Sequence, residues 1–130
     1  MTAYLWIAAG SGLGGMARYA TSGLMAAQFG TAFPWGTLLI NIVGSFLIGL
    51  VAALTGPEER WPVAPDIQRF LTVGFLGGYT TFSAFSLETL KLVQDGAMLR
   101  ASAYVGLSVA LCLVAVSAGY AAGKVFYRNA

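Results

Sequence analysis

Residues 74–86 read GFLGGYTTFSAFS and lie inside a long apolar region. These positions hold three glycines, two threonines, two serines and three phenylalanines. The adjacent pair Gly77 and Gly78 costs a helix about 2 kcal/mol relative to two alanines. Residues 79–81, which are aromatic or β-branched, do not compensate for that loss. We therefore expect a helix that is interrupted at about residues 77–80.

A break of this kind restricts what can surround it. In lipid, non-helical backbone is tolerated only where it is buried in protein or faces a polar cavity. The carbonyl groups that a break releases are hard oxygen ligands, which suit a small cation. The backbone at residues 77–80 is therefore a candidate Na⁺ or K⁺ site.

The whole chain is apolar enough to predict its class. Of its 130 residues, 58% are hydrophobic and 9% are charged, and the mean hydropathy is +0.75. Ordinary soluble domains are roughly 25% charged. We expect an all-α integral membrane protein with one transmembrane domain, residues 1–130, because the length holds about four spans and little else. The expected spans are residues 4–27, 35–55, 67–93 and 101–126, and the clearest linker is residues 56–66.

The residue types argue against several classes of function. The chain has no histidine and one cysteine, Cys112, so it lacks the Ser-His and Cys-His dyads and cannot form an internal disulfide. The net charge of +2 does not favour nucleic acid as a partner. The stretch GSGLGG at residues 10–15 matches a dinucleotide-binding pattern, but it lies in an apolar span with no acidic residue near it. We interpret its glycines as packing contacts and expect no enzymatic activity.

Other glycines recur at four-residue spacing, which lets helix backbones approach closely in lipid. We interpret them as packing between spans of one subunit rather than as a specific dimer motif. The pairs are Gly10 with Gly14, Gly74 with Gly78, and Gly119 with Gly123.

The basic residues are almost evenly divided between the two sides of the membrane. With a cytoplasmic N-terminus, four lie inside and two or three lie outside. Because Lys and Arg set orientation, so weak a bias permits insertion both ways round, and hence an antiparallel homodimer. A modest preference for one topology is the alternative, and the charges leave both open. The inner set is Arg60, Arg69, Lys124 and Arg128, and the outer set is Lys91 and Arg100, with Arg18 leaning to that side.

Three polar residues within the expected spans need a reason, because a charge at the centre of a span costs about 2.5–3.5 kcal/mol. Arg18 lies in the first span, Asn41 in the second and Glu88 in the third. Arg18 and Glu88 can snorkel to an interface, and Asn41 can form an interhelical hydrogen bond. The functional alternative is that all three line a wet vestibule.

The residues after the expected break form two stripes. Phe82 and Phe85 share one helical face, and Ser83 and Ser86 form a neighbouring hydroxyl stripe. Phenylalanines in a span usually contact lipid or the core. An aromatic ring, however, has a positive edge, so inward-facing edges and hydroxyls suit a small dehydrated anion such as fluoride.

At this point the sequence resembles a known family, the Fluc/CrcB fluoride channels. The resemblance rests on GFLGGYTTFSAFSLET, on GGMARY around Arg18, on PWGTLLINIVGSFLIG around Asn41, and on Tyr104 and Ser108 in YVGLS. It covers all four expected spans in order. Members of the family are dual-topology homodimers with two pores, which implies an antiparallel homodimer with a broken third helix.

The resemblance also implies roles for individual residues. The carbonyls of Gly77 and Thr80 would hold a structural Na⁺ at the dimer centre. Phe82 and Phe85 would line the fluoride pore, and Arg18 would form the electropositive vestibule. Other pore residues would be Asn41, Ser83 and Thr37, and the polar track would include Glu88, Tyr104 and Ser108. Two positions depart from the common pattern: Ala84 replaces a hydroxyl residue and Cys112 replaces a small polar one.

The expected function is therefore a passive fluoride channel in the bacterial inner membrane, which exports F⁻ from the cytosol. A small multidrug exporter is a rival, but such exporters depend on an acidic residue in the first span, and residues 4–27 contain none. A different proton-coupled transporter would depend on Glu88. A non-transporting assembly protein would explain the glycines but not the hydroxyls and phenylalanines after the break.

Overall fold

The computed structural model describes residues 1–55 and 63–129, and these residues form helices and no strand. The all-helical class is therefore confirmed. The expected linker at residues 56–66 lies mostly outside the described residues, as does Arg60. The helices are α1 (Thr2–Phe29), α2 (Trp35–Leu54), α3 (Pro65–Arg69), η1 (Phe70–Leu76), α4 (Gly77–Tyr79), α5 (Phe82–Gln94) and α6 (Met98–Asn129).

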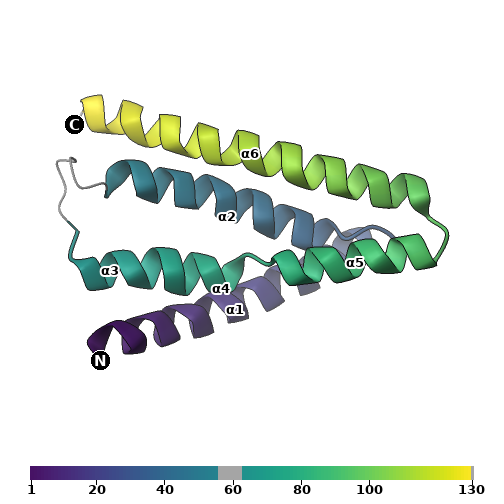
Figure 1. Cartoon of the computed structure of the whole chain (residues 1–130), viewed down its shortest axis with the longest axis horizontal. Coiled ribbons are helices and arrows are strands. Elements are labelled where there is room, and N and C mark those ends of the chain that lie inside the picture. Colours follow the sequence, from purple (N-terminus) through teal and green to yellow (C-terminus); the bar gives the residue numbers. More distant parts are fainter. Residues whose placement is uncertain (56–62, 130) are drawn as a thin grey trace.

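Figure 1 shows four roughly aligned rods, the third of which runs from α3 through η1 and α4 to α5. Three stretches are long and apolar enough to cross a membrane: α2, residues 65–94 and most of α6, with mean hydropathies of 2.3, 1.2 and 2.0. α1 has the length, 28 residues, but is less apolar. The chain is thus a multi-pass membrane protein.

Glycines allow the rods to approach one another closely. A Cβ at Gly49 would collide with the Val116 carbonyl, and one at Gly119 with the Phe46 carbonyl, so α2 and α6 touch through backbone. On the other side of the molecule, a Cβ at Gly10 would lie 2.6 Å from the Phe70 carbonyl oxygen of η1. This agrees with the expected packing role of glycines at four-residue spacing.

The interpretation of the stretch at residues 10–15 needs a partial correction. Gly10 and Gly14 do pack, because a Cβ on either would overlap backbone atoms of the third rod. Gly12 and Gly15 meet nothing within 4 Å. They lie on the opposite side of α1, so they are not packing contacts among the described residues.

The third rod is interrupted at two threonines. α4 ends at Tyr79, Thr80 (φ −78°, ψ 158°) and Thr81 (φ −155°, ψ 115°) are extended, and α5 begins at Phe82. The extended residues are thus centred later than residues 77–80, and both glycines remain helical. Gly78 serves contact instead, because a Cβ there would lie 2.6 Å from the Ser11 carbonyl oxygen.

Candidate functional site

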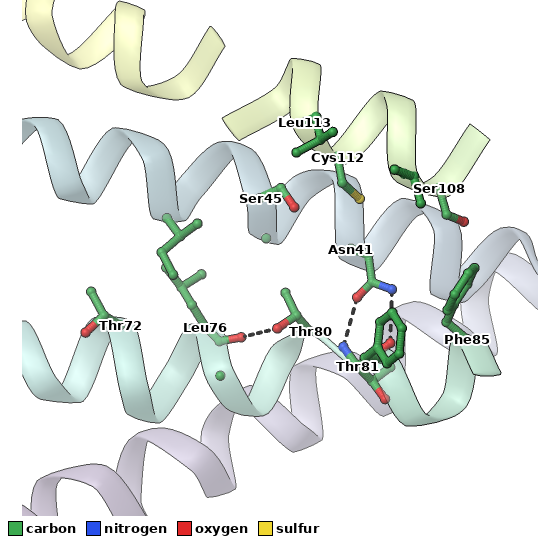
Figure 2. A pocket seen from close by; sticks show the side chains of 15 residues that line it. Asn41, Ser45, Thr72, Leu76, Thr80, Thr81, Phe85, Ser108, Cys112 and Leu113 are labelled. Carbon is green, nitrogen blue, oxygen red and sulfur yellow. Dashed lines mark hydrogen bonds between the residues drawn. The ribbon is translucent and has the colours of Figure 1, made fainter. Parts of the chain in front are cut away.

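The Asn41 side chain joins α2 to the extended segment. Its Nδ2 donates to the Thr81 carbonyl oxygen at 3.0 Å, and its Oδ1 accepts from the Thr81 N–H at 2.8 Å, as Figure 2 shows. In a continuous helix that N–H would donate to the Gly77 carbonyl, four residues back. The amide therefore replaces helical hydrogen bonds lost at the break. This is the interhelical hydrogen bond that the sequence offered as the simpler alternative for Asn41.

Thr81 also caps α5. Its Oγ1 accepts from the Ala84 N–H at 3.1 Å and lies 3.2 Å from the Ser83 Oγ. A threonine at the N-cap satisfies one of the free N–H groups at a helix start. Ala84 takes part through its backbone, so its missing hydroxyl does not disturb this cap.

A cavity of about 390 Å³ lies beside this segment, between α2, the third rod and α6. Phe82 and Phe85 line it with ring centroids 5.3 Å apart and planes at 45°. A Cβ at Gly44 would collide with the Thr80 methyl group, so Gly44 lets the extended segment lie against α2. The lining residues are Asn41, Gly44, Ser45, Ile48, Thr72, Leu76, Gly77, Thr80, Thr81, Phe82, Phe85, Ser108, Val109, Cys112 and Leu113. We call this the phenylalanine cavity.

One wall of the phenylalanine cavity carries a hydroxyl without a partner. Ser108 is 6% exposed, and within the described part of the chain its Oγ has no hydrogen-bond partner. Cys112 lies one helical turn further along α6 and lines the same cavity. A buried hydroxyl without a partner costs free energy unless a ligand, water or ion satisfies it.

A hydrogen-bonded cluster lies beyond Phe85. The Thr37 Oγ1 donates to Glu88 Oε1 at 2.9 Å, and the Tyr104 hydroxyl donates to Glu88 Oε2 at 2.7 Å. Tyr104 is fully buried, and its ring centroid lies 5.2 Å from that of Phe85. Each carboxylate oxygen thus has one short bond from a hydroxyl. We call Thr37, Glu88 and Tyr104 the hydroxyl–carboxylate cluster.

A second cavity, of about 530 Å³, lies on the far side of this cluster. Thr37 and Glu88 contribute to its wall, and charged residues from α5 and α6 surround it. Its lining consists of Ser22, Ala26, residues 30–37, Glu88, Lys91, Leu92, Asp95, Ala97 and Arg100. We call this the charged cavity.

The structure brings most of the expected site residues together in two groups. Asn41, Gly77, Thr80, Phe82, Phe85 and Ser108 line the phenylalanine cavity, and Thr37 and Glu88 line the charged cavity with Tyr104 beside them. Ser83 is exposed at the start of α5. Arg18 is half-buried in the second half of α1 and lines neither cavity.

Sequence reasoning did not single out the backbone of Thr81 as the partner of Asn41. No local signal marks this contact, because the two residues are 40 positions apart. Lys91 and Arg100 were considered only as charges that bear on membrane orientation, and Asp95 was not considered. The available signal was that these three charged residues lie close together in sequence, around the short turn between α5 and α6. A short turn brings such residues to the same end of the molecule.

Comparison with known proteins shows the family of the chain. The family model described as "CrcB-like protein, Camphor Resistance (CrcB)" matches residues 5–120. A protein of Methylocella silvestris is 52% identical over 117 residues, 90% of this chain and 89% of its own length, and is named "Fluoride-specific ion channel FluC". Proteins of the same name from Opitutus terrae and Rhodospirillum rubrum are 52% and 54% identical over 94% and 90% of this chain, and over 92% and 91% of their own lengths. The chain belongs to the CrcB family.

Proposed function

We propose that this chain forms a fluoride channel of the bacterial inner membrane, through which F⁻ leaves the cytosol passively. One observation carries the proposal: proteins named as fluoride-specific channels are 52% to 54% identical over at least 90% of this chain. The site geometry is compatible with it. The physical need is simple, because hydrogen fluoride is a weak acid that crosses membranes neutral and dissociates inside. The trapped anion then requires a protein pathway.

The phenylalanine cavity offers what a small dehydrated anion needs. The Phe82 and Phe85 rings lie side by side, and ring edges are electropositive. The Ser108 hydroxyl has a proton without an acceptor among the described residues. Asn41 holds the adjacent backbone in place through Thr81, so we assign it a positioning role beside the anion path. No step in this pathway requires covalent chemistry.

The extended segment suits a structural Na⁺. The Thr81 N–H donates to Asn41, so the Gly77 carbonyl is released from the bond that a continuous helix would give it. The Thr80 carbonyl belongs to extended backbone, and both residues line the phenylalanine cavity. Carbonyl oxygens are hard ligands that fit Na⁺. A bound Na⁺ would hold two such segments together at the centre of a dimer.

We further infer an antiparallel homodimer with α1 as a fourth span. Phe82 is 77% exposed on one copy of the chain, so a single copy leaves one side of the proposed ion path without a wall at this ring. A second, inverted copy would cover this face and complete the path. Cysteine labelling from both sides of the membrane tests the topology: half of the copies should be labelled from each side, and uniform labelling would overturn it.

Flux from liposomes tests the function. Purified protein in vesicles loaded with fluoride should release it when a K⁺ gradient and a K⁺ ionophore provide charge balance, and should retain chloride under the same conditions. Absence of fluoride release would sink the proposal. Release that requires stoichiometric proton movement would instead indicate a transporter that uses Glu88. A structural Na⁺ predicts that activity is lost when Na⁺ is removed during purification.

A further inference from the structure

The charged cavity lies at the end of the molecule where the α1–α2 loop meets the turn between α5 and α6 (Figure 1). The loop supplies residues 30–34, and the turn supplies Asp95 and Ala97. Because both are connections between helices, this end of the molecule is expected to lie near a membrane surface. The cavity is therefore placed to exchange ions with water.

Two side chains, Phe85 and Tyr104, connect the wall of the phenylalanine cavity to the wall of the charged cavity. Phe85 lines the phenylalanine cavity and packs against Tyr104, with ring centroids 5.2 Å apart. The Tyr104 hydroxyl reaches Glu88, which lines the charged cavity. A chain of contacts through Phe85, Tyr104 and Glu88 therefore joins the walls of the two cavities.

The charges of this cavity are arranged unevenly around Glu88. Lys91 follows Glu88 by three positions on α5, so the two share a helical face. Arg100, in the first turn of α6, provides a second cation, and Asp95 a second carboxylate. Lys91 and Arg100 are exposed, and in the ranges 1–55 and 63–129 neither forms an ion pair. Both cations therefore remain available to an anion.

We propose that the charged cavity is an anion mouth of the pathway, in which Lys91 and Arg100 capture the ion beside the hydroxyl–carboxylate cluster. An anion that approaches Glu88 meets a repulsive carboxylate, and the two cations offset that repulsion. Cations beside an opening raise the local concentration and entry rate of an anion, and here Lys91 and Arg100 act against two carboxylates, those of Glu88 and Asp95. The Asp95 carboxylate repels the anion and so weakens its binding at this mouth. This inference rests on the proposed function.

The double variant K91Q/R100Q tests the mouth in fluoride-loaded liposomes. At an ionic strength of about 0.01 M, charges act over about 30 Å, whereas at about 1 M they act over about 3 Å. The variant should lose about threefold to tenfold of the fluoride flux at low ionic strength, and most of this difference should disappear at high ionic strength. D95N should change flux in the opposite direction under the same conditions.

Two further variants separate capture from structure. R69Q removes an exposed arginine that lines neither cavity, and its flux should equal that of the parent. K91R/R100K keeps both charges and should recover most of the flux that K91Q/R100Q loses. Flux of K91Q/R100Q equal to the parent at low ionic strength, or a loss of equal size at both ionic strengths, overturns the anion mouth. Absence of flux in the parent overturns the proposed function instead.

Discussion

The two cavities differ in how far their polar and aromatic side chains find partners within one chain. The hydroxyl–carboxylate cluster beside the charged cavity is satisfied, with both Glu88 oxygens bonded and Tyr104 fully buried. The phenylalanine cavity has an unpartnered Ser108 hydroxyl, and Phe82 is 77% exposed. The first region is stabilised by its own contacts. The second acquires its missing partners only from an ion, water or another copy of the chain.

Because of this difference, substitutions in the two regions should have different effects on folding stability and on ion flux. Where polar groups already pair with one another, removing one leaves another buried group without a partner, so the folded chain is destabilised. Where a side chain is exposed, removing it leaves the chain itself nearly unaffected. Substitutions in the two regions should therefore divide into those that change both stability and flux and those that change flux alone.

Asn41→Ala should have the largest effect, because this side chain holds the extended segment of the third rod against α2. The substitution leaves the Thr81 N–H and carbonyl without their partners, at about 1–3 kcal/mol for each group. We expect a lower thermal unfolding midpoint in detergent and almost complete loss of fluoride flux. Ser45→Ala, one turn along α2 on the same cavity, is the matched control. An Asn41→Ala protein with parental stability would show that the bridge to Thr81 is dispensable.

Phe82→Ile should reduce flux strongly without a comparable loss of stability. The Phe82 ring is largely exposed on one chain, so its removal costs few contacts within that chain. Loss of about 1–2 kcal/mol of ion stabilisation by a ring edge slows transport roughly fivefold to thirtyfold. The measurement is fluoride flux beside the unfolding midpoint of the same preparation.

Phe85→Ile provides the contrast to Phe82→Ile. Phe85 packs against the buried Tyr104, so its loss should lower both stability and flux. Parental flux in Phe82→Ile would mean that ring edges do not coordinate the ion. Equal losses of stability in the two variants would remove the distinction between the exposed and the satisfied region.

The sequence predicted the all-α fold class, because hydropathy is a local pattern, whereas the roles of the site residues came from the resemblance to a family and stay predictions. Hydropathy located the helices to within about three residues, and the composition of residues 74–86 identified an irregular segment. The exact position of the extended residues was not predictable from helix propensity. Gly78 is retained by contact with Ser11 in α1, and Thr81 is extended because Asn41 bonds to its backbone. Both causes are tertiary.

The same limit applies to the pairing of polar groups. Glu88 was expected either to snorkel or to line a vestibule, and nothing near it in the sequence specified two hydroxyl donors. Thr37 is 51 positions away and Tyr104 is 16 positions away. Such contacts depend on how α2 and α6 pack. The glycines allow these helices to approach closely, but they do not specify which polar side chains then meet. The distant partners of buried polar residues are therefore what a single sequence leaves open.

Tyr104→Phe should have an intermediate effect and tests the satisfied region directly. It removes the 2.7 Å donor to Glu88 Oε2 but keeps the ring against Phe85. A hydrogen bond to a charged group contributes about 1.5–3 kcal/mol, so the unfolding midpoint should fall. Flux should fall as well if the cluster lies on the ion path. Reduced stability with parental flux would restrict the cluster to a structural role and would weaken the proposed path between the cavities.

Thr81→Ala should have the smallest effect, because it removes the cap of α5 but leaves the backbone bridge to Asn41 intact. The lost bond from the Ala84 N–H costs about 0.5–2 kcal/mol of stability. Thr81→Ser retains the capping oxygen and should keep the parental unfolding midpoint. If Thr81→Ala destabilised the chain as much as Asn41→Ala, the hydroxyl rather than the amide bridge would hold the extended segment. In that case the extended segment would be held by contacts within the third rod and not by its bonds to α2.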